Sequence, residues 1–320
     1  MYLPSDSDLA PQISAFLVYQ LANFISVWSR MGPRCSHDSF ANLLYTNHPV
    51  ANDEGRLLRA VGRIKIIRYF IRKWAITQSV SVIEQLKAGI RYFDVRLSIP
   101  DCHTSLTGIH VLHALYGRQL SYILFEINRF LMSHKKEVII LDFNHFYNFD
   151  FVSFKEFIKL IENSFALKTL TPRCPLSGLS LDFMWKYGYQ IIAIIPYHYS
   201  DNQMKISWIW GPESIVSPYP NVNRLDHLFK FLEITLKNHR KTHKECFYVT
   251  QAILTAKFRD ICFHPWSSLK ETFSIKCTEQ TVSWISSFAH PSFFNIIMCD
   301  FINYYNFCEI VAYLNYQLID

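Results

Sequence analysis

The stretch "GIRYFDVRLSIP", Gly89–Pro100, has the alternating pattern of a strand whose two faces differ. Side chains at positions i and i+2 of a strand share a face, so Asp94 and Arg96 point the same way, while Phe93 and Val95 point the other way. A salt bridge on a half-exposed strand would explain an isolated Asp-x-Arg pair. A functional site requires further polar side chains at the same place.

The composition is that of a globular protein. The chain has 320 residues, of which half are apolar and 16% aromatic, and this excludes wholesale disorder. A chain of this length forms one large domain or two smaller ones, and the dispersed Gly and Pro residues favour one. The net charge of +6 favours an anionic surface or substrate but is too small and too scattered to indicate nucleic acid.

Two segments and the cysteine content indicate whether the protein associates with a membrane and in which cellular compartment it acts. "GRIKIIRYFIRKWAITQ", Gly62–Gln78, mixes basic and apolar residues, which fits a helix on an anionic membrane or an ordinary amphipathic helix. The apolar run Ile13–Trp28 is interrupted by polar residues and is short for a membrane span. Eight scattered cysteines without a C-x-x-C pair indicate neither zinc nor a dense disulfide framework. We expect a reduced, cytoplasmic protein, with membrane association of the N-terminus as an alternative.

Several apolar runs end in polar residues, as strands buried on both faces do in a parallel sheet. They are Gly89–Pro100, Glu137–Phe146, Tyr189–Ser200 (ending at Tyr197 and His198), Cys246–Thr255 and Phe293–Phe301. Helical patterns alternate with them, at Thr77–Ile90, Val152–Ala166 (with a capping box formed by Ser153 and Glu156) and Asn223–His239. This alternation predicts an α/β fold with a parallel sheet, either doubly wound or closed into a barrel.

In a (β/α) barrel the active site lies at the carboxyl ends of the strands. We therefore expect Asp94 and Arg96 to share a barrel mouth with Asp142, Asn144 and Asp300. Two histidine segments add to this site: "CSHDSF" carries His37 and Asp38, and "IHVLHALYG" carries His110 and His113. A lone histidine is more often structural, but a pair can act as base and acid beside an arginine that holds a phosphate.

A set of collinear motifs resembles the phosphatidylinositol-specific phospholipase C X-domain-containing proteins. The motifs are "SHDSF", "WAITQSVSVIEQLKAGIRYFDVRL", "HALYG", "EVIILDFNHFY", the Trp-Gly-Pro and Tyr-Pro-Asn stretch at 208–223, "VTQAILT" and "IIMCDF". The resemblance runs from about Pro33 to the C-terminus. It implies a single distorted (β/α) TIM-like barrel, the catalytic domain, over residues 32–320, preceded by a divergent segment 1–31 of uncertain structure.

The resemblance also implies roles for individual residues. His37 matches the general base that takes the proton of the inositol 2-hydroxyl, and Asp300 matches the carboxylate that supports this base. His113 matches the general acid that protonates the diacylglycerol oxygen, with Asp38 as its carboxylate partner. We prefer His113 to His110, which is three residues away and is expected on the other face.

Arg96 matches the phosphate-binding arginine of the metal-independent branch, and Asp94 the acid beside it. Asp142 and Asn144 are expected to contact the substrate together with Arg96. The implied activity is a phosphoric diester hydrolase that cleaves phosphatidylinositol, or a related anionic phospholipid, through a cyclic phosphate. The resemblance implies no metal and no cofactor, a peripheral membrane location, a role in lipid metabolism and signal transduction, and no obligate protein partner.

Two departures from the family pattern leave alternatives open. Arg34 and Cys35 stand where Pro and Gly are usual, and Ala114 replaces a glycine. The main alternative hypothesis is therefore a pseudoenzyme, that is, a catalytically weak lipid-binding barrel. A metal-dependent phosphodiesterase would need an acidic residue at position 96 or a second carboxylate beside His113, and we expect neither. The loop Ile206–Pro212 is rich in aromatic residues, which either insert into a membrane or pack inside the protein.

Overall fold

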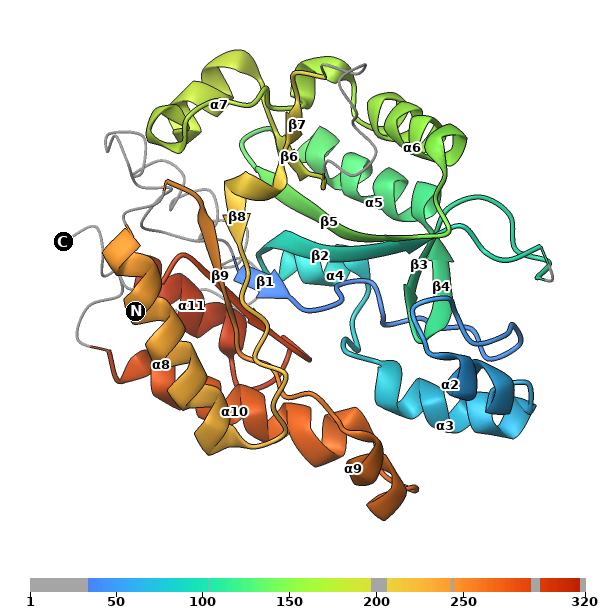
Figure 1. Ribbon diagram of the computed structural model, residues 1–320. Coiled ribbons are helices and arrows are strands. Elements are labelled where there is room, and N and C mark those ends of the chain that lie inside the picture. Colours follow the sequence, from blue (N-terminus) through green and yellow to red (C-terminus); the bar gives the residue numbers. More distant parts are fainter. Residues whose placement is uncertain (1–33, 103, 197–205, 243–244, 289–293, 317–320) are drawn as a thin grey trace, which may run out of the picture.

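Eight parallel strands curl into an open barrel in the computed structural model, which describes residues 34–102, 104–196, 206–242, 245–288 and 294–316 (Figure 1). In spatial order the strands are β7 (Ile209–Trp210), β6 (Ile191–Ile194), β5 (Ile139–Tyr147), β2 (Ile90–Ser98), β1 (Arg34–Ser36), β10 (Ile296–Cys299), β9 (Phe247–Gln251) and β8 (Ile215–Val216). The distorted single barrel expected from the sequence is confirmed. Segment 1–31 with its apolar run, and Tyr197 and His198, lie outside the described residues.

Helices and a hairpin complete the barrel. β3 (His110–His113) and β4 (Leu115–Gln119) form an antiparallel extension on β2. The described helices are α2 (Arg56–Val61), α3 (Lys65–Ala75), α4 (Val82–Lys87), α5 (Leu120–Ser133), α6 (Phe151–Ser164), α7 (Leu181–Tyr187), α8 (Leu225–Thr242), α9 (Phe258–Phe263), α10 (Ile275–Ser286) and α11 (Phe307–Tyr316). None of these helices combines the length and the apolar character that crossing a membrane requires.

The two faces of each strand have different environments, as the alternation in β2 indicates. Phe93 and Val95 point outward into the large core between strands and helices. Tyr92 points inward and packs with Cys35 and Met298 in a smaller cluster inside the barrel. Cys35 therefore fills the interior of the barrel, and a cysteine at this position is compatible with the parallel pairing of β1 to both β2 and β10.

The predicted start of α6 was wrong, and the structure decides between the two interpretations of the aromatic loop. The N-cap of helix α6 is Asp150, three residues before the predicted cap Ser153, and it accepts a hydrogen bond of 2.8 Å from the Ser153 backbone amide. In the aromatic loop Ile206–Pro212 the side chains of Trp208 and Trp210 are buried, and the Trp210 indole donates to the Thr171 carbonyl. The tryptophans of this loop therefore pack inside the protein, which was one of the two interpretations of its sequence.

Gly89 makes the sharp entry into β2 possible. Its φ is +91°, and a Cβ at this position would lie 2.0 Å from the guanidinium of Arg34, which donates to the Ala88 carbonyl. A residue with a Cβ is strained at this φ. The position therefore requires glycine.

We expect Gly89→Ala to lower the free energy of unfolding by about 1–2 kcal/mol, the approximate cost of forcing an L-residue into positive φ. Urea denaturation measures it. Gly178→Ala is the control, because Gly178 has open space around it and an ordinary φ. Equal effects of the two substitutions would contradict the backbone argument.

Candidate active site

The side chains expected at the barrel mouth come together at the carboxyl ends of neighbouring strands. His37 and Asp38 follow β1 directly, and Asp300 follows β10. Arg96 lies near the end of β2, and His113 ends β3. Because β10, β1 and β2 are adjacent parallel strands, their carboxyl ends meet at one edge of the barrel.

Two aspartates flank the imidazole of His37. Its Nδ1 lies 2.7 Å from Asp300 Oδ1, and its Nε2 lies 3.3 Å from Asp38 Oδ2. Donation from Nδ1–H to Asp300 fixes the tautomer and leaves Nε2 as the nitrogen that exchanges a proton. All three side chains are largely buried.

Asp38 is the centre of the cluster, because three cationic or protonatable groups surround its buried carboxylate. Arg96 Nε lies 2.8 Å from Oδ1, and Nε2 of both His37 and His113 lies 3.3 Å from Oδ2. Burial alone would raise the pKa of Asp38, but Arg96 and the two histidines outweigh it and lower this pKa. Arg96 therefore pairs with Asp38, and its ion pair is not the intrastrand one that the Asp-x-Arg spacing suggests.

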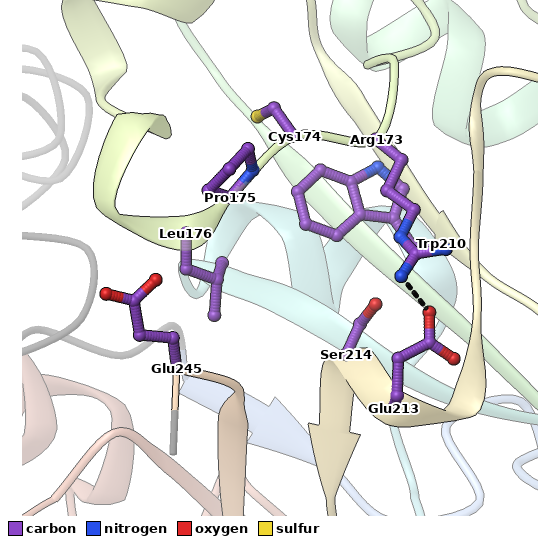
Figure 2. Close-up of a pocket in the computed structure, with 8 residues that line it drawn as sticks. All are labelled: Arg173, Cys174, Pro175, Leu176, Trp210, Glu213, Ser214 and Glu245. Carbon is purple, nitrogen blue, oxygen red and sulfur yellow. Dashed lines mark ion pairs between the residues drawn. The ribbon is translucent and has the colours of Figure 1, made fainter. Parts of the chain in front are cut away.

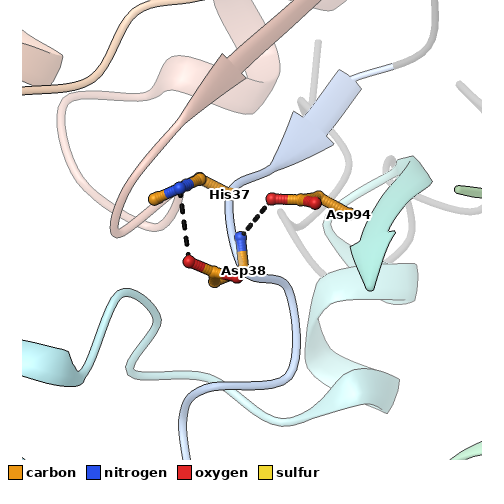
Figure 3. A group of neighbouring side chains, drawn as sticks. All are labelled: His37, Asp38 and Asp94. Carbon is orange, nitrogen blue, oxygen red and sulfur yellow. Dashed lines mark hydrogen bonds and ion pairs between the residues drawn. The ribbon is translucent and has the colours of Figure 1, made fainter. Parts of the chain in front are cut away.

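Asp94 supports the backbone of Asp38, which has a positive φ of 36° (Figure 3). Asp94 Oδ2 accepts a hydrogen bond of 2.9 Å from the Asp38 amide, and its other oxygen accepts one from the Asn144 side chain. The Ser39 hydroxyl accepts a hydrogen bond from the Asp94 amide. Asp94 thus acts beneath the site, where it holds Asp38 in a strained conformation.

His113 has acceptors at both ring nitrogens. Its Nδ1 lies 2.6 Å from the Ala75 carbonyl, and its Nε2 faces Asp38. This arrangement satisfies the protonated imidazolium, the form that a general acid requires. His113 and Arg96 are also the most open members of the cluster, with 22% and 23% of their side chains exposed. His110 is buried and lies against the Gly117 and Thr107 carbonyls, as expected for the residue on the other face.

Asp53 is a second carboxylate beside His113, and the expectation that none is present was wrong. Its Oδ2 accepts a hydrogen bond of 2.8 Å from the amide of Ala114, the residue after His113. Burial raises the pKa of Asp53, although this backbone bond, His113 and Arg96 act in the opposite direction. Ala114 replaces a glycine and has a φ of 58°, which is unfavourable for a residue with a Cβ. The hydrogen bond from its amide to Asp53 stabilises this conformation.

Asp142 and Asn144 lie on β5 next to Asp94. Asp142 is buried, accepts a hydrogen bond of 2.5 Å from the Tyr92 hydroxyl, and has its pKa raised to about 7, mainly by burial. Asn144 is partly exposed and accepts a hydrogen bond from His145 Nδ1, while its amide donates to Asp94. Asp142 therefore forms the floor of the site, and Asn144 and His145 reach towards its mouth. His145 was not among the residues predicted from the sequence for this site.

The contacts of the cluster also decide whether it could hold a cation. His37, Asp38 and Asp94 could supply ligand atoms within 4.8 Å of one another. Both Asp38 oxygens already face Arg96 or a histidine, and both Asp94 oxygens accept hydrogen bonds. The guanidinium would repel a bound cation by about 4 kcal/mol per unit charge at 4 Å and an effective dielectric of 20. These residues therefore do not fit a divalent metal ion.

Polar side chains from α4 and from the segment before it form hydrogen bonds with residues at the ends of the strands. Thr77 donates to the Asp38 carbonyl and Gln78 donates to the carbonyls of His37 and Cys299, so both residues hold the β1 loop, and Gln78 ties it to the β10 loop. Gln85 accepts from Ser36 and donates to the Ser39 carbonyl. None of these residues was predicted from the sequence to belong to the site. The signal for Gln85 is a glutamine within the apolar stripe of a short helix.

The described residues also form a cavity of about 370 Å³ away from this chemistry (Figure 2). It lies near the amino ends of β8 and β9, beside Trp210 of β7, and is lined by Arg173, Cys174, Pro175, Leu176, Trp210, Glu213, Ser214 and Glu245. None of the expected site residues lines it. Catalysis in barrels of this type takes place at the opposite, carboxyl end of the strands.

The open parallel barrel has the fold of two solved bacterial phospholipases. The structure of the phosphatidylinositol-specific phospholipase C from Listeria monocytogenes matches with a TM-score of 0.61 and 17% identity, over 92% of this chain and 97% of that one. A mutant form of the Staphylococcus aureus enzyme matches with a TM-score of 0.59 and 15% identity, over 92% and 97%. At these identities the likeness concerns the fold.

Sequence comparison identifies the family. PI-PLC X domain-containing protein 2 of Mus musculus is 32% identical over 286 residues, which cover 89% of this chain and 82% of the relative. Its Homo sapiens counterpart is 33% identical over 237 residues, or 74% and 75% of the two chains. No protein-family model matches the sequence. The chain belongs to the PI-PLC X domain-containing proteins.

The proton on His37 links stability to pH. Burial by itself would lower the pKa of His37, but Asp38 and Asp300 outweigh it and raise the pKa to about 9. The raised pKa stabilises the folded state fully below pH 6.5, the usual value, and this contribution is lost as the pH rises through 9. We expect the wild type to lose more unfolding free energy across this pH window than His37→Gln does. Urea titrations at both ends of the window measure this, and parallel losses would mean that His37 is neutral in the resting protein.

Proposed function

We propose that the chain is a metal-independent phosphodiesterase that cleaves phosphatidylinositol, or a related anionic phospholipid, to diacylglycerol and inositol phosphate. The observation that carries the proposal is the single carboxylate of Asp38 in ion-pair contact with Arg96, His37 and His113. One base, one acid and one fixed cation within reach of a common point are what transfer of a phosphoryl group to a neighbouring hydroxyl requires.

The first step forms a cyclic phosphate. His37 Nε2 takes the proton of the inositol 2-hydroxyl, and that oxygen attacks the adjacent phosphorus. The bond from phosphorus to the diacylglycerol oxygen breaks, and His113 gives its Nε2 proton to this leaving oxygen. Arg96 neutralises the non-bridging oxygens as charge develops. In the second step the roles reverse: His113 takes a proton from a water molecule, whose oxygen attacks the phosphorus of the cyclic phosphate. The bond from phosphorus to the inositol 2-oxygen breaks, and His37 gives its proton to that oxygen.

The supporting residues act through these groups. Asp300 orients His37, Asp94 holds the Asp38 backbone, and Asn144 and His145 lie where the inositol ring would enter. Because the pKa of resting His37 is about 9, only about 1% of the base is free at pH 7. The free-base fraction of His37 should therefore rise with pH up to about 9.

An aromatic and basic rim offers a way to reach the lipid surface. The rim consists of the exposed side chains of α9, of the turn after it and of α3, namely Phe258, Phe263, Trp266, Ile66 and Tyr69. Lys73 of α3 donates to the Trp266 carbonyl, and the Phe70 ring lies 5.5 Å from that of Trp266, so the two helices form one surface. α3 and α9 lie at the lower edge of the view in Figure 1, after the carboxyl ends of β1 and β9.

Apolar side chains beside basic ones suit a peripheral protein on an anionic membrane. Arg63, Lys65 and Arg259 supply positive charge on α3, α9 and the connection between α2 and α3. We propose that residues 32–320 act as one unit on the cytoplasmic face of a membrane, with the rim against the lipid.

The activity test measures release of water-soluble inositol phosphate from phosphatidylinositol vesicles, with and without EDTA. We expect EDTA-resistant release that His37→Ala lowers by a factor of at least about 10² and Arg96→Ala by a similar factor. Thr281→Val, a buried change whose lost hydroxyl donates to the Cys277 carbonyl and to none of the cluster residues, serves as the matched control.

Two outcomes would contradict the proposal. Release that EDTA abolishes would show that a metal ion is needed and that Arg96 has another role. Vesicle binding by the folded wild type without release would make the chain a lipid-binding barrel, in which the altered segment at Arg34 and Cys35 fails to support catalysis.

The rim is tested separately by Phe263→Ser combined with Trp266→Ser. These exposed positions tolerate polar residues, so the melting temperature should stay the same. Binding to anionic vesicles in a sedimentation assay should weaken about ten-fold or more, because two aromatic side chains leave the interface. Hydrolysis of a soluble inositol phosphodiester should be unchanged. Unchanged vesicle binding would place the membrane contact elsewhere.

A further inference from the structure

The two oxygens of the Asp300 carboxylate have different partners. Oδ1 lies 2.7 Å from His37 Nδ1, and Oδ2 accepts a hydrogen bond of 2.9 Å from the Ser274 hydroxyl. Ser274 is 1% exposed and Asp300 is 3% exposed, so water does not compete for this bond. Rotation of the carboxylate away from His37 would therefore break two buried hydrogen bonds at once.

A second hydroxyl from the same helix holds the backbone of Asp300. Thr278 Oγ1 donates to the Asp300 carbonyl at 2.9 Å, and Thr278 is also 1% exposed. Ser274 and Thr278 are four residues apart, so they lie on one face of the continuous helical segment. This face points at the end of β10 and contacts Asp300 through both its side chain and its main chain.

A π-helical turn, Lys270–Ser274, directly precedes α10 and carries the first of these hydroxyls. Such turns are rare and occur often at functional sites. Phe273 of this turn packs edge-on against Trp74 of α3, with ring centroids 6.4 Å apart. The turn is thus fixed on one side by α3 and on the other by Asp300, and it follows shortly after the exposed Trp266 of the rim.

We infer that Ser274 and Thr278 are positioning residues for the proposed reaction, because they hold Asp300 so that its carboxylate orients His37 as the base. This inference rests on the proposed function. Neither hydroxyl is placed to touch the substrate, since both lie behind Asp300. Their effect on the reaction passes through Asp300 to His37 Nδ1.

Loss of the Ser274 hydroxyl leaves Asp300 Oδ2 buried without a donor, which is unfavourable for a carboxylate. The carboxylate can relieve this by rotating or by taking up a proton. Either response weakens the negative charge at His37 Nδ1 and loosens the imidazole. The other groups that face His37 are Asp38, Asp94 and His113, and none of them contacts Ser274 in the described structure. A change at His37 in a Ser274 variant therefore reports on Asp300.

The test compares Ser274→Ala and Thr278→Val with Thr281→Val. Thr281 is buried on the same helix, and its hydroxyl donates to the Cys277 carbonyl, not to Asp300. We expect kcat on phosphatidylinositol vesicles, compared at the optimal pH of each protein, to fall about ten-fold or more in Ser274→Ala, with KM nearly unchanged, and to fall less in Thr278→Val. The rising limb of the pH–rate profile should move to lower pH in Ser274→Ala. Ser274→Thr, which keeps a hydroxyl, should recover most of the rate.

An NMR titration of the His37 imidazole, assigned by its loss in His37→Gln, gives a readout that does not need turnover. We expect the pKa of His37 to fall in Ser274→Ala and to stay at the wild-type value in Thr281→Val. If the wild type releases no inositol phosphate but this pKa shift appears, the proposed function fails while the link from Ser274 through Asp300 to His37 stands. An unchanged His37 pKa together with an unchanged kcat would overturn the inference and make Ser274 a structural residue only.

Discussion

The buried carboxylate of Asp38 is the constraint on which the rest of the site depends. A charge removed from water costs several kcal/mol unless partners replace its hydration. Arg96 and two histidines supply this replacement, and all three come from different segments of the chain. The ion cluster therefore ties the end of β1 to the ends of β2 and β3. Each member depends on the others, because removal of one leaves an uncompensated charge.

The barrel makes this cluster possible through the register of its strands. Asp38 adopts a positive φ because the Asp94 carboxylate of the neighbouring strand accepts a hydrogen bond from its amide, and the Thr77 hydroxyl donates to its carbonyl. Gln78 then joins the loop after β1 to the end of β10, and Asp300 follows directly after that end. Short strands suffice here, since side-chain hydrogen bonds beyond the strand ends complete the alignment.

The long strands could be predicted from the sequence, because β2 and β5 carry nine residues each and their apolar alternation is clear. β1, β7 and β8 have only two or three residues, too few for a periodic pattern. Two other features could not be predicted, for physical reasons. Exposed and buried tryptophans look alike in sequence, as Trp208 and Trp266 show. Contacts such as those of Asp53 and Ser274 join residues that are far apart in the chain, and no local spacing signals them.

The two histidines are chemically alike but have different surroundings, and this difference suits opposite roles. His113 faces one carbonyl and one carboxylate and is open to the mouth, where a proton can leave for a departing oxygen. His37 lies between two carboxylates and holds its proton strongly in the resting state. In the proposed reaction the small free fraction at pH 7 would lower the rate by about 10². The free base is correspondingly stronger, so part of this loss would return in the proton-transfer step. The same carboxylates that stabilise the buried cluster thus also set the strength of the base.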